Sequence, residues 1–235
     1  MTRTEIKRTA KNPPRQRAAR RPTESAPEKR PTRLADRIPD KRAAKRDAIL
    51  MAALDEFSAN GFAAARLDDV ARRAGVAKGT IYLYFSDKET LFQELVRSML
   101  NPVVGAVEAA RLTDLPFPVL AERIVGMFVR EILGTRRKDV IRLVLVEGAR
   151  FPKIAEFYYR EVLERVMSAI STLLERAAER GEVRHAAIAR FPQLLVAPGL
   201  VAILWSGLFD RFSPLDAEAL MRAHLDLIFG ERNER

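Results

Sequence analysis

The spacing of apolar residues restricts this chain to helical folds. Large aliphatic and aromatic side chains recur at intervals of three and four, and hardly any stretch alternates apolar with polar residues. A period near 3.6 places such side chains on one face of an α-helix, whereas a half-buried strand requires alternation. The chain has only 11 glycines in 235 residues and is 48% hydrophobic, enough for a sizeable core. We therefore predict an all-α protein.

Composition excludes several classes of function. The chain has no cysteine, so it forms neither disulfides nor thiolate metal sites. Its two histidines, His185 and His224, belong to no cluster with metal-ligand spacing, and neither G-x-S-x-G nor a phosphate-binding glycine-rich loop occurs. We expect no enzyme activity, no metal and no cofactor. No apolar run at the N-terminus is typical of a secretory signal, which predicts a cytoplasmic protein.

Residues 1–40 differ in composition from the rest of the chain. They hold 12 Lys and Arg against five Asp and Glu, together with six of the 13 prolines. With hardly any large apolar side chains, this segment buries too little surface to offset the entropy lost on ordering. We predict a disordered basic arm over 1–40, typical either of a polyanion partner or of a solubilising tail.

Three helical stripes follow the arm. The first begins after Asp40, a suitable N-cap residue, and ends at Gly61. The second covers 67–74, and the third begins near Lys78 after a tight turn that contains a glycine. Two short helices joined in this way predict a helix-turn-helix over about 66–85.

A fourth helix is expected from about Asp87, because Ser86 and Glu89 have the spacing of a capping box. Pro102 should end or kink it. Further helices are predicted near 116–133, 138–150, 152–180, 188–210 and 214–229. These elements divide the chain into a helix-turn-helix domain over 43–103 and a larger helical domain over 104–235.

The stretch GVAKGTIYLYF crowds aromatic residues onto a short helix. On a helix starting near Lys78, Ile81 and Phe85 lie four residues apart and can face a core together, whereas Tyr82 and Leu83 point elsewhere. Exposed side chains of this kind suit a helix laid in a DNA major groove. The alternative is that the tyrosines are ordinary core residues.

The run GFAAARLDDVARRAGVAKGTIYLYFSDKETLF resembles the N-terminal module of TetR-type transcriptional regulators. The resemblance implies a homodimer that binds a near-palindromic DNA operator, with a C-terminal helical domain that binds a small-molecule inducer and dimerises. It implies a repressor, the family's usual mode, that the inducer releases from DNA. By position, the implied DNA contacts are Arg66, Lys78, Gly79, Thr80, Tyr82, Leu83, Tyr84 and Lys88.

Two positions depart from the family's pattern. Arg66 stands where Ser or Thr generally caps the second helix, and Ala77 stands where a small hydroxyl residue commonly caps the third. Loss of a cap oxygen costs about 1 kcal/mol. A phosphate held by Arg66 is one way to offset this loss in the DNA complex.

The segment 191–209 carries no charge and has two interpretations. Its 19 residues are long enough to cross a membrane, which would make the protein a membrane-tethered regulator. However, Gln193, Pro198 and Gly199 interrupt it, and its small residues favour close helix packing at a subunit interface. We expect the interface, since the resemblance implies that the last two helices form a four-helix bundle in the dimer, and we expect no membrane partner.

Candidate ligand contacts lie on the central helices of the C-terminal domain, where a mostly apolar pocket with a few polar anchors would suit an apolar or amphipathic inducer. The alternative for each residue is plain core. An inward Glu131 or Glu147 needs a partner, either Arg142 or Arg150 or a cationic ligand. The candidates are Met127, Phe128, Glu131, Leu143, Glu147, Phe157, Tyr158 and Trp205.

Overall fold

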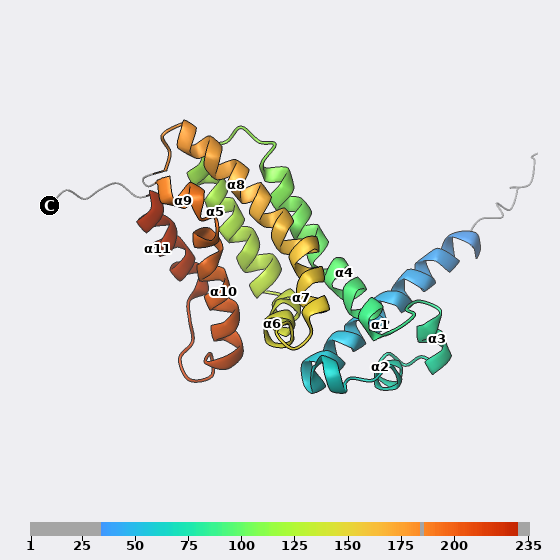
Figure 1. Cartoon of the computed structure of the whole chain (residues 1–235). Coiled ribbons are helices and arrows are strands. Elements are labelled where there is room, and N and C mark those ends of the chain that lie inside the picture. The colour runs from blue at the N-terminus through green and yellow to red at the C-terminus, as the bar shows by residue number, and fades with distance from the viewer. Residues whose placement is uncertain (1–33, 184–185, 230–235) are drawn as a thin grey trace, which may run out of the picture.

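The computed structural model describes residues 34–183 and 186–229, and within these ranges all regular structure is helical, as predicted (Figure 1). Of the disordered arm expected over 1–40, residues 1–33 lie outside the described residues, whereas 34–40 form the first part of a helix. The N-terminal part consists of α1 (Leu34–Ala64), α2 (Leu67–Arg73), α3 (Lys78–Tyr82) and α4 (Lys88–Ala110). In Figure 1, α2 and α3 lie beside α1 at one end of the molecule, and α4 runs from there into the rest of the protein.

Three predicted helix ends are wrong. α1 begins at Leu34, so Asp40 lies inside the helix and not at its N-cap. Asp87, not Ser86, caps α4, because its carboxylate accepts a hydrogen bond from the Thr90 N–H at 2.7 Å. α4 also does not end at Pro102 but continues to Ala110, and it buries residues on both sides of the proline, among them Leu100 and Val104.

The C-terminal domain contains two π-helical segments, η1 and η2, which continue α5 and α7. Helices α8, α10 and α11 pack with α4 and α5 into its body (Figure 1). The elements are α5 (Phe117–Met127), η1 (Phe128–Leu133), α6 (Arg137–Glu147), α7 (Pro152–Tyr158), η2 (Tyr159–Leu163), α8 (Glu164–Glu179), α9 (Ala186–Arg190), α10 (Gln193–Leu208) and α11 (Ala217–Phe229). The helix predicted over 188–210 is therefore two helices, which separate at Phe191–Pro192.

An aromatic cluster joins the two parts of the protein. Phe57 and Phe62 of α1 pack with Phe92 of α4, with ring centroids 5.6 to 5.8 Å apart. Phe151, directly before α7, places its ring 5.1 Å from Phe62. Because this cluster lies in one continuous core, the helix-turn-helix domain rests directly on α6 and α7.

A histidine compensates for the proline inside α10. Pro198 has no N–H, so the Leu194 carbonyl loses its donor within the helix. The His224 Nε2 of α11 lies 2.7 Å from this carbonyl oxygen. A carbonyl only accepts hydrogen bonds, so Nε2 carries the proton. His224 therefore ties α11 to α10.

The membrane-tethered interpretation of 191–209 is not supported. Among the described residues, no helix is long and apolar enough to span a bilayer. α10 has 16 residues, and Phe191 and Pro192 lie outside it.

Candidate nucleic-acid interface and ligand cavity

The recognition segment divides its side chains between core and surface, as the spacing predicts. Ile81 and Phe85 are fully buried and anchor α3 in the core that also contains residues of α1, α2 and α4. Tyr82 and Leu83 are 50% and 76% exposed. The two residues are adjacent at the C-terminal end of α3, on the surface opposite the buried side chains, so a helix laid in a major groove would present them to the DNA.

Several residues beside this pair make contacts within the protein that the sequence did not indicate. Lys78 pairs with Asp68 of α2 at 2.8 Å, and this hydrogen bond raises the pKa of the ammonium. Tyr84 is half-buried, with the Arg42 guanidinium 5.7 Å from its ring centroid. Gly79 is exposed, and a Cβ added there would meet no atom from outside its own helix within 4 Å, whereas Thr80 is half-buried.

Both expected helix caps are missing. Arg66 and Ala77 occupy the N-cap positions of α2 and α3 in extended conformation, and neither side chain caps its helix. Arg66 is exposed at the start of α2. The first N–H groups of both helices therefore lack the side-chain acceptor that usually satisfies them.

Lys88 has a role that the sequence did not reveal. Its ammonium donates hydrogen bonds to the carbonyl oxygens of Ala63 and Ala65, at 2.9 and 3.2 Å, and lies 4.8 Å from the Phe62 ring centroid. Burial lowers the pKa of this lysine. Lys88 thus closes the C-terminal end of α1, and one donor of the ammonium is left for the phosphate contact, which stays a prediction.

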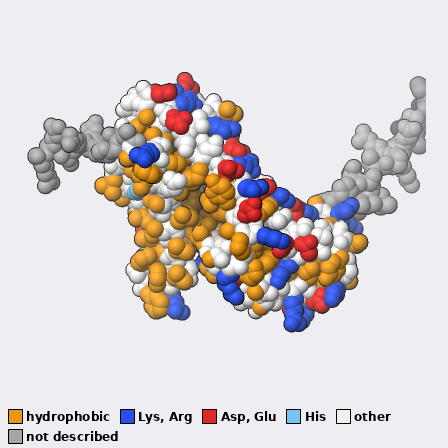
Figure 2. Space-filling view, in the orientation of Figure 1, with side chains coloured by type: hydrophobic (Ala, Val, Ile, Leu, Met, Phe, Trp, Pro, Cys, Tyr) orange, Lys and Arg blue, Asp and Glu red, His pale blue; other side chains and the backbone are white. Residues whose placement is uncertain are grey.

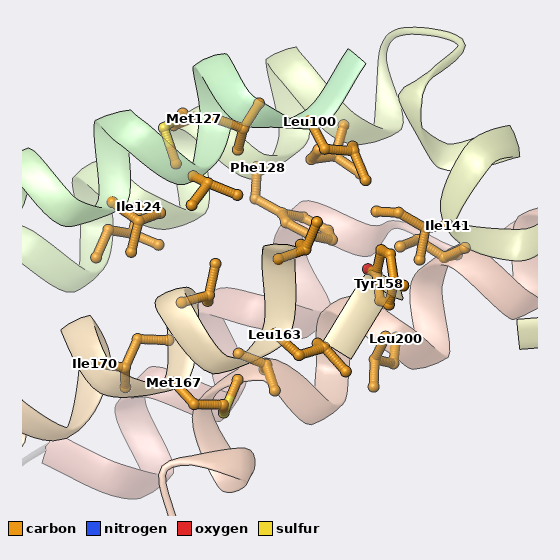
Figure 3. A pocket seen from close by; sticks show the side chains of 18 residues that line it. Leu100, Ile124, Met127, Phe128, Ile141, Tyr158, Leu163, Met167, Ile170 and Leu200 are labelled. Atoms are coloured by element: carbon orange, nitrogen blue, oxygen red, sulfur yellow. The ribbon is translucent and has the colours of Figure 1, made fainter. Parts of the chain in front are cut away.

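The C-terminal domain encloses a cavity of about 140 Å³ (Figure 3). Its walls come from α4, α5, η1, α6, α7, η2, α8 and α10, so both π-helical segments contribute to it. Three predicted ligand contacts, Met127, Phe128 and Tyr158, line this cavity. π-helical segments occur frequently at functional sites, which marks the cavity as more than a packing defect.

The other predicted ligand contacts lie elsewhere. Leu143 and Glu147 line a separate groove against α1, and Phe157 packs under the Arg97 guanidinium, 4.9 Å from its ring centroid. Trp205 donates a hydrogen bond to the Ser213 carbonyl at 2.6 Å. Helical spacing places a residue on a face of its helix, but it does not tell which neighbour covers that face.

Neither glutamate pairs with the arginines that the sequence indicated. Glu131 has a side chain 47% exposed and pairs with Arg137 at 2.9 Å. Glu147 is 6% exposed, and among the described residues its Oε2 has no hydrogen-bond partner. Its Oε1 instead faces Gly61 of α1, where an added Cβ would lie 2.7 Å away. Glu147 is thus a contact between the two domains and not a wall of the cavity.

A chain of ion pairs also connects the two domains, and no local sequence signal indicates it. Glu94 of α4 binds both Arg46 of α1 and Arg97, one turn further along α4. Arg97 binds Glu161 of η2 at 3.2 Å, and this bond, together with Glu94, raises the pKa of its guanidinium. These ion pairs therefore connect η2, a π-helical segment in the cavity wall, to the helix-turn-helix domain.

One face of α10 is apolar and exposed. Hydrophobic side chains gather on the side of the molecule formed by α10 and α11 (Figure 2). Leu200 of α10 is partly exposed and lines the cavity, and the other exposed apolar residues of α10 are separated by alternating intervals of three and four, which is the spacing of a helix–helix seam. We call these residues the α10 seam: Leu194, Ala197, Val201, Leu204 and Leu208.

Known protein families match both domains of this chain. The family described as "Bacterial regulatory proteins, tetR family" matches residues 49–95, and "Tetracyclin repressor-like, C-terminal domain" matches 121–224. YhgD of Bacillus subtilis, an uncharacterized HTH-type transcriptional regulator, is 28% identical over 180 residues, 75% of this chain and 90% of its own.

Two further proteins support the match. The HTH-type transcriptional regulator RutR of Escherichia coli is 31% identical over 121 residues, 52% of this chain and about half (49%) of RutR. The structure of the SmeT–triclosan complex has the same fold, with a TM-score of 0.67 and 20% identity over 79% of this chain and 92% of SmeT. With its helix-turn-helix and its C-terminal domain both matched, the chain belongs to the TetR family of DNA-binding transcriptional regulators.

Proposed function

We propose that this protein is a repressor that binds a near-palindromic operator as a homodimer and leaves it when a small molecule binds in the C-terminal domain. The exposed pair Tyr82 and Leu83 on a helix anchored by Ile81 and Phe85 carries the DNA-binding part of this proposal. A rigid scaffold that presents such side chains is what readout of base edges in a major groove requires.

The proposed operator contacts extend beyond this pair. Gly79 permits close approach of the α3 backbone, and Lys78, Thr80 and Tyr84 surround it. Lys78 must leave or share Asp68 in order to reach a phosphate. Arg66 and Lys88 complete the set, with Arg66 as the more accessible cation.

The experiment that tests operator binding is a footprint on DNA upstream of the protein's own gene, followed by fluorescence anisotropy with the protected duplex. We expect protection of two half-sites about one helical turn apart, because a two-fold dimer presents two copies of α3. Binding of equal affinity to a scrambled duplex would contradict sequence-specific recognition.

Arg66→Ala should weaken operator binding about 5- to 10-fold while base preference stays the same, because the lost group contacts phosphate and not a base. Anisotropy titrations at several salt concentrations should also give a shallower salt dependence, since fewer counterions are released. The control is Arg160→Ala, which removes an exposed arginine from η2. Equal affinities for Arg66→Ala and the unmodified protein would refute the phosphate contact.

The α10 seam is the proposed dimer interface, together with α11. Three exposed residues of α11, Ala219, Ala223 and Leu227, follow each other at intervals of four and extend the apolar surface. TetR-family regulators function as dimers, and a seam of this spacing allows α10 to pack against its symmetry mate.

Leu204→Glu should convert the dimer into a monomer. It introduces a charge near the middle of the α10 seam, and we expect the dimer dissociation constant to rise about 100-fold because the carboxylate must lose its hydration at the interface. Light scattering should report twice the chain mass of 26.5 kDa for the unmodified protein and the mass of one chain for the variant. Leu112→Glu, at an exposed leucine between α4 and α5, should stay dimeric. A dimeric Leu204→Glu protein would exclude this seam.

The cavity supports release by a small molecule. It adjoins α4, which carries the helix-turn-helix domain, and the ion-pair chain from Glu161 to Arg46 reaches that domain through the same helix. A molecule that fits the cavity only after α4 has moved would lower operator affinity by its differential binding to the two states. SmeT, which has the same fold, is known in complex with triclosan.

A further inference from the structure

Tyr158 is the polar side chain of the cavity. Its ring is 6% exposed, and its oxygen is turned toward the interior of the space (Figure 3). Burial raises the pKa of the phenol, so it remains protonated near neutral pH. Among the described residues, none hydrogen-bonds this hydroxyl. Because the hydroxyl borders the open space of the cavity and has no partner among the described residues, it is available to bond an occupant.

The rest of the lining excludes charged occupants. Apart from Tyr158, the other seventeen lining side chains are aliphatic, methionine or phenylalanine. An ion transferred into such a lining loses its hydration without gaining a partner, at a cost of several kcal/mol. The occupant must therefore be neutral.

The size and polarity of the cavity favour an organic molecule over water. A stable buried water needs two to four polar partners, and the side chains of this lining offer one. A dry engineered cavity of about 150 Å³ lined by aliphatic and aromatic residues binds benzene, and this cavity measures about 140 Å³. An occupant about the size of one substituted ring fits without any rearrangement.

The positions of the two π-helical segments support a built site. Tyr158 immediately precedes η2, Phe128 is the first residue of η1, and both side chains line the cavity (Figure 3). Gly199 of α10 makes room for the Phe128 ring, because an added Cβ would lie 2.8 Å from its Cζ. The π-helical backbone and the contact with Gly199 thus place the rings of Tyr158 and Phe128 against the same cavity.

We propose that the cavity binds a neutral, compact, mainly apolar molecule with one oxygen, such as a ketone, which accepts a hydrogen bond from the Tyr158 hydroxyl. This ligand class rests on the proposed small-molecule control, but binding itself is measured without DNA. The Tyr158 phenol selects the oxygen-bearing molecule, and the aliphatic walls select its size and neutrality.

The test uses two probes of nearly the same shape, acetophenone and α-methylstyrene, in which a CH₂ group replaces the carbonyl oxygen. Their affinities are measured by calorimetry on the full chain, on Tyr158→Phe and on Tyr159→Phe. Tyr159 is the matched control, since it is the next residue and is 53% exposed. Tyr158→Phe should weaken acetophenone binding about 5- to 10-fold relative to α-methylstyrene, because the carbonyl loses its donor. Tyr159→Phe should leave the ratio of the two affinities unchanged.

Two results would overturn the proposal: an unchanged affinity ratio in Tyr158→Phe, or no binding of acetophenone to the unmodified protein at its solubility limit. Operator release is then measured separately by anisotropy with saturating acetophenone. A probe that binds through Tyr158 but leaves operator affinity unchanged would uphold the site and contradict small-molecule release. The two proposals are therefore distinguishable.

Discussion

Gly61→Ala should lower the free energy of unfolding by about 3 kcal/mol, a fall in Tm of roughly 10 °C. Gly61 has φ 72° and ψ 167°, a region of backbone conformation that is essentially restricted to glycine. The added Cβ would also lie 2.7 Å from Glu147 Oε1. Thermal unfolding followed by circular dichroism measures the effect, and operator affinity at low temperature shows whether the domains still fit together.

Two further variants separate backbone strain from the contact with Glu147. Gly75→Ala adds a methyl group at φ +65° with no atom nearby, so it should cost only the backbone part, about 1–2 kcal/mol. Adding Glu147→Ala to Gly61→Ala removes the clash, so the two substitutions should cost less together than the sum of their separate effects. Strict additivity would show that the contact between Gly61 and Glu147 contributes nothing.

The double substitution Tyr82→Ala with Leu83→Ala should reduce operator affinity about 100-fold and leave the fold intact. Each side chain that contacts a base edge contributes about 1–3 kcal/mol, and both of these are exposed in the free protein, so their removal opens no cavity. Anisotropy with the footprinted operator and with a scrambled duplex gives specific and nonspecific affinity in one experiment. Only the specific part should fall.

The matched control replaces the same residue types elsewhere on the surface. Tyr159→Ala with Leu112→Ala removes a tyrosine and a leucine that are 53% and 84% exposed, far from α3 in the chain. This protein should bind the operator like the unmodified one. If the α3 double variant also retained full specific affinity, α3 would not be the recognition helix and the proposed function would lose its main support.

The helix-turn-helix was predictable because its signals are local. Ile81 and Phe85 lie four residues apart, and this spacing alone identifies which face of α3 is buried. The missing helix caps at Arg66 and Ala77 could also be predicted, from the residue types alone. The second role of Lys88 was not predictable, since its partners Ala63 and Ala65 are brought close only by the turn between α1 and α2.

The ligand site shows the limit of such reasoning. Of the predicted ligand contacts, Met127, Phe128 and Tyr158 line the cavity, whereas Trp205, Phe157 and Glu147 belong to other contacts. Ligand binding by the first three stays a prediction. Each of these side chains faces inward on its own helix to some degree. Which space it meets depends on how helices far apart in sequence cross.

By itself, the sequence determined that the chain is helical, that residues near 66–85 form a helix-turn-helix, and that Tyr82 and Leu83 face away from the core. These properties follow from periodicity and turn chemistry within a few residues. Only the tertiary structure decided that α4 continues through Pro102, that His224 satisfies the Leu194 carbonyl, and that Tyr158 is left alone in an apolar cavity. The physical reason is that a buried polar group needs a hydrogen-bond partner within about 3 Å, and helix packing decides which groups come that close. Residues that meet in this way can be far apart in the sequence, so the sequence alone does not indicate them.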